Sequence, residues 1–61
     1  LGNHAFYMDR HRGVLGYSTE AVDINGGSVV VRITGRGLQL QAMTEQELRI
    51  DGVIEKIELV E

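Results

Sequence analysis

The stretch from Ser28 to Gln41, SVVVRITGRGLQLQ, decides the fold. Residues 29–33 carry an apolar side chain at every second position, and this period of two is typical of a half-buried strand. The same alternation resumes in residues 38–42. Between them, the two glycines of Thr34-Gly35-Arg36-Gly37 can adopt positive φ without a Cβ penalty, so the chain can reverse there. The stretch therefore predicts a β-hairpin at the centre of an all-β domain.

A second turn signal precedes this stretch. Asn25-Gly26-Gly27 contains the Asn-Gly and Gly-Gly dipeptides that two-residue primed turns require, because both of their central residues need positive φ. Apolar alternation flanks the signal on both sides. We therefore expect a tight hairpin that joins a strand over Ala21–Ile24 to the central stretch.

Two further segments decide how the strands are counted. Thr44-x-x-Glu47 matches a helix capping box, but period-two alternation resumes directly after it, which favours a polar turn. Ile57 lies on the opposite parity from Ile54, so Glu55-Lys56 is predicted to be a tight turn or a bulge.

The sequence as a whole predicts seven short, mostly antiparallel strands, arranged as a meander that forms a small barrel or a two-layer roll. The expected strands are Ala5–Met8, Val14–Tyr17, Ala21–Ile24, Val29–Ile33, Leu38–Ala42, Leu48–Ile54 and Ile57–Leu59. The expected core is Phe6, Met8, Leu15, Tyr17, Val22, Ile24, Val29, Val31, Ile33, Leu38, Leu40, Leu48, Ile50, Ile54, Ile57 and Leu59.

Length and composition indicate a single small domain over residues 1–61. It has no cysteine for disulfides or structural zinc, and a core of this size is marginal, so either the core is efficient or self-association completes it. Because Leu1 is not an initiator Met, we expect the chain to be an excerpt of a slightly longer one. The absence of cysteine fits a cytoplasmic protein, and no apolar run is long enough for a membrane span.

The polar residues suggest no enzyme. A Ser-His-Asp triad can be drawn from Ser18 or Ser28 with His11 and Asp23, but the nucleophile elbow is missing. His4 and His11 fall on opposite faces of any shared strand, and Asp9 with His11 gives too few ligands for zinc. We therefore predict no catalytic, cofactor-binding or metal-binding residues.

Nucleic-acid binding is the main alternative function. Small β-barrels bind single strands through a basic groove and stacking aromatic side chains. Such a groove would use Arg10, Arg12, Arg32 and Arg36, and the stacking residues would be Phe6, Tyr7 and Tyr17. The net charge of −3 and the expected burial of Phe6 and Tyr17 argue against it.

The pattern of several spaced residues resembles that of the YabP/YqfC family of sporulation proteins, and of its YqfC-like subgroup in particular. The matching runs are His11-Arg12-Gly13-Val14-Leu15-x-Tyr17, Glu20-x-Val22-x-Ile24-Asn25, Val31-x-Ile33-x-Gly35-x-x-Leu38-x-Leu40 and Leu48-x-Ile50-x-Gly52-x-Ile54-x-x-Ile57-Glu58. The resemblance implies a non-enzymatic protein of the sporulating cell. From the thin core and open strand edges we expect it to act through protein contacts, as a homo-oligomer or with other sporulation proteins.

Overall fold

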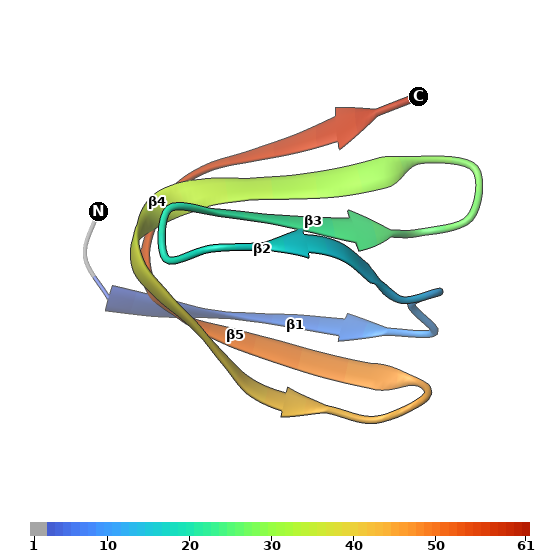
Figure 1. The fold of residues 1–61 in the computed structure, drawn as a ribbon, viewed down its shortest axis with the longest axis horizontal. Coiled ribbons are helices and arrows are strands. Elements are labelled where there is room, and N and C mark those ends of the chain that lie inside the picture. Colours follow the sequence, from blue (N-terminus) through green and yellow to red (C-terminus); the bar gives the residue numbers. More distant parts are fainter. Residues whose placement is uncertain (1–2) are drawn as a thin grey trace.

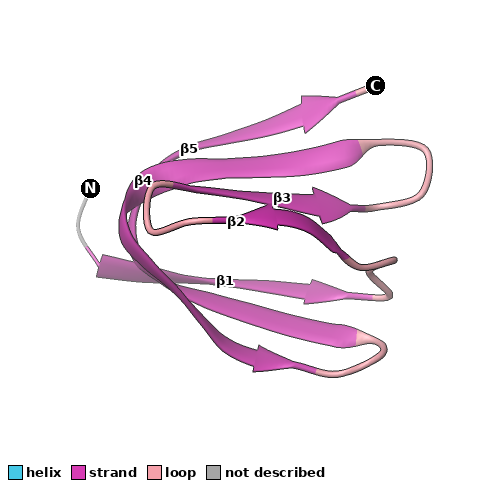
Figure 2. Ribbon diagram, in the orientation of Figure 1, coloured by secondary structure: helices cyan, strands magenta, loops and turns pink. Residues whose placement is uncertain are grey.

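Residues 3–61, which the computed structural model describes, form five strands and no helix (Figures 1 and 2). The strands are β1 (Asn3–Asp9), β2 (Val14–Tyr17), β3 (Ala21–Asn25), β4 (Val30–Met43) and β5 (Glu47–Val60). Every neighbouring pair is antiparallel, in the order β1-β5-β4-β3-β2. The all-β class is confirmed. The seven strands and the barrel are not, because five strands form one open sheet with β1 and β2 at its edges.

Two predicted interruptions lie inside long strands. The turn expected at Gly35-Arg36-Gly37 is wrong, because β4 runs through it from Val30 to Met43. β5 likewise continues through Glu55. There Thr34 lies opposite Lys56 and Gly35 opposite Ile54, so Glu55 is the extra residue of a bulge, one of the two predicted alternatives.

A shared bend in β4 and β5 folds the sheet back over itself, so that its two halves face each other (Figure 1). Glycines allow the two backbones to approach at this bend. A Cβ on Gly35 would overlap the carbonyl oxygen of Val53, and a Cβ on Gly52 would lie 2.7 Å from the carbonyl oxygen of Gly37. Gly52 also has a φ of 137°, which side chains strongly disfavour.

The hydrophobic core lies between the two halves of the sheet. Its buried members are Val22, Ile24, Val31, Ile33, Leu38, Leu48, Ile50 and Ile54, and the partly buried Phe6, Met8, Val14 and Leu40 pack against them. Val29 is half-buried. Four residues predicted to be core are instead exposed by half or more: Leu15, Tyr17, Ile57 and Leu59.

The error in β2 has a local cause. Val14 lies opposite Ile24 and Gly16 opposite Asp23, so Leu15 is an extra residue in a bulge and turns away from the core. Tyr17 lies opposite the buried Val22 but at the sheet edge. Its hydroxyl reaches β4 instead, where it donates to the Leu38 carbonyl (3.2 Å) and accepts from the Leu40 N–H (3.3 Å).

The turns before and after β4 are both hairpins. The β3–β4 hairpin is confirmed, but the chain reverses at Gly27 and Ser28, later than Asn-Gly, because the Gly26 N–H donates to the Val29 carbonyl (2.9 Å) and Gly27 has a φ of 94°. The β4–β5 turn is the polar turn expected from the sequence. The Thr44 hydroxyl accepts from the Glu47 N–H at 2.9 Å without any helix.

Candidate interaction surface

The C-terminal half of β5 has a free backbone edge within residues 3–61. β1 pairs with β5 only as far as Asn3 opposite Val53. Among the described residues, β5 therefore pairs with β4 alone from Ile54 to Val60. An edge of this kind presents unsatisfied N–H and C=O groups, and it is a template for pairing with another strand.

On the core-facing side of this edge strand, two apolar side chains are exposed by half or more, Ile57 and Leu59, which we call the β5 strip. Ile57 lies opposite Ile33 and Leu59 opposite Val31, and residues directly opposite each other point to the same face. Ile33 and Val31 are buried, whereas Ile57 is 50% and Leu59 69% exposed. The core-facing side of the sheet thus extends past the part that the other half covers.

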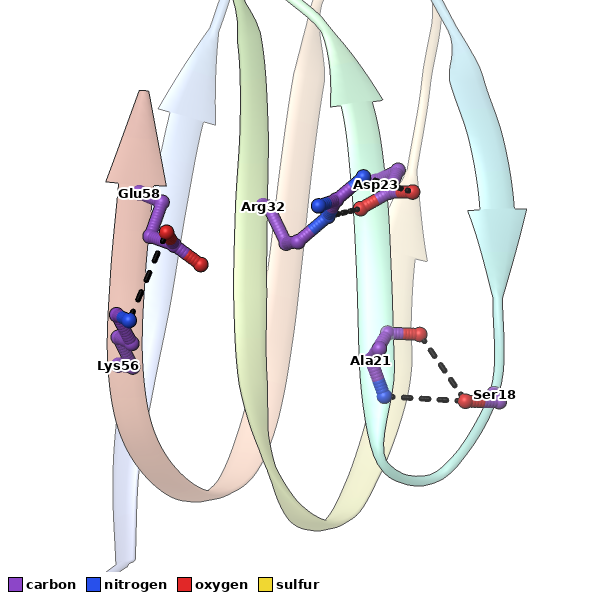
Figure 3. Close-up of polar contacts among 6 residues, drawn as sticks. All are labelled: Ser18, Ala21, Asp23, Arg32, Lys56 and Glu58. Atoms are coloured by element: carbon purple, nitrogen blue, oxygen red, sulfur yellow. Dashed lines mark hydrogen bonds and ion pairs between the residues drawn. The ribbon is translucent and has the colours of Figure 1, made fainter. Parts of the chain in front are cut away.

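The opposite face of the same edge is charged (Figure 3). The Lys56 ammonium lies 3.6 Å from a Glu58 carboxylate oxygen. On the neighbouring strands the Arg32 guanidinium donates to Asp23 at 2.9 Å. The hydrogen bond and the charge of Asp23, with a smaller contribution from Glu58, raise the pKa of Arg32 above its ordinary value. From Lys56 to Leu59, β5 therefore combines an apolar inner face with a charged outer face.

Sequence alternation assigned the β5 strip to the correct face but not to the surface. The bulge at Glu55 resets the parity, and this puts Ile57 and Leu59 on the same side as Ile54. Whether an inward-facing residue is covered depends on how far the other half of the sheet extends. That length is set by the position of the bend, for which the alternation contains no signal.

A shallow polar hollow of about 530 Å³ lies on the outer face of the other half of the sheet. Its lining residues are Ala5, Gly37, Gln39, Gln41, Arg49, Asp51 and Gly52. The Arg49 guanidinium donates to Asp51 at 2.9 Å and stands 5.3 Å from the centre of the Tyr7 ring. The hydrogen bond to Asp51, followed by its charge, raises the pKa of Arg49. Because Asp51 already compensates its only cationic lining residue, the hollow has no unmatched charge to attract an ionic ligand.

His11 holds two connections together and is buried, with 8% of its surface exposed. Its Nε2–H donates to the Thr44 carbonyl at 2.8 Å, and its Nδ1 accepts from the Gly13 N–H at 3.0 Å. The two bonds together require the tautomer with the proton on Nε2. His11 therefore joins the β1–β2 connection to the β4–β5 turn as a structural residue.

We expect His11→Ala to lower the free energy of unfolding by about 1–3 kcal/mol, because the Thr44 carbonyl and the Gly13 N–H each lose a partner at a buried site. Urea unfolding followed by circular dichroism measures the change. Glu45→Ala, an exposed substitution in the same β4–β5 turn, is the matched control. Equal midpoints for the two variants would contradict the structural role of His11.

The residues of the Ser-His-Asp triad considered from the sequence form separate local hydrogen bonds. The Ser18 hydroxyl bonds to both the N–H and the carbonyl of Ala21, and Asp23 pairs with Arg32 (Figure 3). His11 bonds to Thr44 and Gly13 instead of to a serine. Ser28 lies in the β3–β4 turn. The structure thus does not bring these residues together.

No group of three or more His, Asp or Glu side chains is arranged to hold a metal ion in the described part of the chain. Asp9 ends β1 and His11 follows in the connection to β2, where both His11 nitrogens are already bonded. The side chain of His4 lies outside the described residues.

The four arginines of the nucleic-acid alternative lie on different parts of the fold. Arg32 pairs with Asp23, and Arg36 pairs with Glu55 at 3.2 Å. Arg10 and Arg12 belong to the β1–β2 connection, where the Arg12 side chain lies beside Gly27. Two of the four charges are thus matched by carboxylates, and Phe6 packs against the core.

Comparison with known proteins identifies no relative of this chain. No protein-family model matches the chain, and no curated protein matches it either. Within residues 3–61 there is also no helix long and apolar enough to cross a membrane.

Proposed function

We propose that this chain is a non-enzymatic β-domain that acts through protein–protein contacts during spore formation. The observation that carries the proposal is the β5 strip, where two large apolar side chains stand exposed on a strand with a free backbone edge. In strand-addition contacts, main-chain hydrogen bonds give the affinity and alternate side chains give the specificity. Burial of apolar surface adds to the affinity. The β5 edge offers both main-chain groups and apolar surface.

The assignment to spore formation rests on the resemblance to the YabP/YqfC family. The most distinctive part of that resemblance is His11-Arg12-Gly13-Val14-Leu15, and the structure gives several of these residues a fold-building role. His11 ties two connections, and Gly13 adopts a φ of 113°. Proteins that share a fold need residues that maintain the same connections, and His11 and Gly13 maintain the β1–β2 connection here. This supports the use of the resemblance in the proposal. The proposed location is the cytoplasm of the sporulating cell.

The first partner we propose is a second copy of the chain, with other sporulation proteins as further partners. A 61-residue domain without cysteine gains stability when its exposed apolar edge is covered. The single-stranded nucleic-acid alternative receives less support, because Arg32 and Arg36 are already paired with carboxylates.

Light scattering coupled to size exclusion tests the contact. We expect a mass above that of the monomer at high protein concentration, and Ile57→Asp is expected to return it to the monomer by placing a charge in the strip. Leu15→Asp is the matched control, because Leu15 is 60% exposed on β2, at the far edge of the same half of the sheet. A monomer at every concentration would refute self-association.

The biological role is tested separately, by deletion of the coding sequence in an endospore-former. We expect development to stop or spores to be defective, and complementation with the Ile57→Asp variant to fail. Normal spores after deletion would remove the assignment to spore formation. Binding of a fluorescent single-stranded oligonucleotide at low salt would instead favour the nucleic-acid alternative.

A further inference from the structure

We infer that two copies of the chain pair symmetrically through the C-terminal half of β5, antiparallel and centred on Ile57. This inference rests on the proposed function, since it specifies the edge and the register of the self-association proposed there. The result is one continuous sheet in which β5 of each copy lies beside β5 of the other. The charges on the outer face and the apolar residues on the inner face both favour this register.

Symmetry limits the registers that are available. In a two-fold antiparallel pair one position lies opposite itself, and every other position lies opposite its mirror partner. The faces of the two sheets must also match, because opposite residues share a face. The centre of the pair must therefore be a residue, and the central candidates are Lys56, Ile57 and Glu58.

The charges choose among these three centres. A centre at Lys56 places two ammonium groups opposite each other, and a centre at Glu58 places two carboxylates opposite each other. Like charges directly opposite are destabilising. A centre at Ile57 instead places Lys56 of each copy opposite Glu58 of the other. This gives two cross-pairs, each of which joins a positive and a negative charge. Only this register leaves no like-charge pair among the three central positions.

The inner face agrees with the same register. The Ile57 side chains lie directly opposite each other, and each Leu59 lies diagonally beside the partner's Ile57, within reach of a long side chain. The four residues of the two β5 strips thus form one apolar cluster next to Val31 and Ile33. The mirror pairing applies to residues 56–58, because the bulge at Glu55 shifts the register beyond Lys56. The Glu55 carboxylate itself is paired with Arg36.

Charge reversal tests the register. Lys56→Glu alone and Glu58→Lys alone are each expected to weaken the dimer about tenfold or more, since both cross-pairs become repulsive. An equimolar mixture of the two variants is expected to restore association, because in the mixed dimer both cross-pairs between positions 56 and 58 again join opposite charges. Analytical ultracentrifugation measures all three samples. If neither substitution changes the dissociation constant of the dimer, this register is overturned, while the proposed contact function stays intact.

Single cysteines read the same register directly, because the chain has no cysteine of its own. Under mild oxidation Ile57→Cys is expected to form a disulfide-linked dimer much faster than Lys56→Cys or Glu58→Cys, since only position 57 lies opposite itself. Faster cross-linking at 56 or 58 would move the centre to that residue and overturn the inference. A protein that is monomeric throughout and cross-links at none of the three positions would overturn both the register and the self-association.

Discussion

Gly35→Ala is expected to leave little or no folded protein. The Cβ of alanine would overlap the carbonyl oxygen of Val53 and lie 3.0 Å from its carbonyl carbon. Both are backbone atoms of the paired strand β5, and no rotamer change relieves the clash. Forcing β4 and β5 apart at the bend would also disturb the bond that the Gly35 N–H makes to the Glu20 carbonyl at 2.9 Å.

We expect Gly35→Ala to lower the free energy of unfolding by about 3 kcal/mol or more, the upper range for overpacking at a site that cannot relax. A domain of 61 residues has a total stability of only about 3–9 kcal/mol. The substitution therefore removes most or all of that stability. Circular dichroism and urea unfolding measure the result.

Gly16→Ala is the matched control for this prediction. Of the described atoms, none lies within 4 Å of a Cβ built on Gly16, and the residue does not adopt a left-handed conformation. We expect Gly16→Ala to change the free energy of unfolding by no more than about 1 kcal/mol. An increase is favoured, because alanine restricts the conformations of the unfolded chain. Folding of Gly35→Ala with a stability close to that of Gly16→Ala would show that the two strands do not approach at the bend as described.

Leu38→Ala is expected to destabilise the domain by about 2–5 kcal/mol, the usual cost of removing a fully buried leucine side chain and leaving a cavity. Leu38 has no exposed surface and lies directly after the bend, where its N–H donates to the Thr19 carbonyl at 2.8 Å. The backbone there is held in place, so the surrounding structure has little freedom to fill the cavity. Thermal and urea unfolding provide the two measurements.

Leu15→Ala makes the same chemical change at an exposed site. Leu15 is 60% exposed at the β2 bulge, and we expect its removal to change the free energy of unfolding by about 0.5 kcal/mol or less. The pair also tests the corrected face of β2, because the sequence alone assigned both leucines to the core. A cost for Leu15→Ala as large as that for Leu38→Ala would restore the original assignment.

The alternation of the sequence predicts the class of fold and much of its core. Eight of the predicted core residues are buried, because period-two patterning fixes the face of a strand once the strand exists. The parity change between Ile54 and Ile57 predicted a tight turn or a bulge at Glu55-Lys56, and the structure has the bulge.

The glycines could not be interpreted in the same way. Gly35 and Gly37 satisfy the requirements of a turn, but they equally satisfy those of a bend at which two strand backbones nearly touch. The alternatives differ in the position of β5, which is far away in sequence. The same long-range information decides that Ile57 and Leu59 remain uncovered, so the candidate surface could not be located from the sequence.

The pairing of β1 with β5 also determines the order in which the domain is completed. β1 leaves the ribosome before β5, yet its only partner strand among the described residues is β5, with three other strands between them. Contacts between such distant segments form slowly, because a large loop must close first. In a newly made chain, Phe6 and Met8 therefore lack their partner residues Ile50 and Leu48 until β5 has left the ribosome.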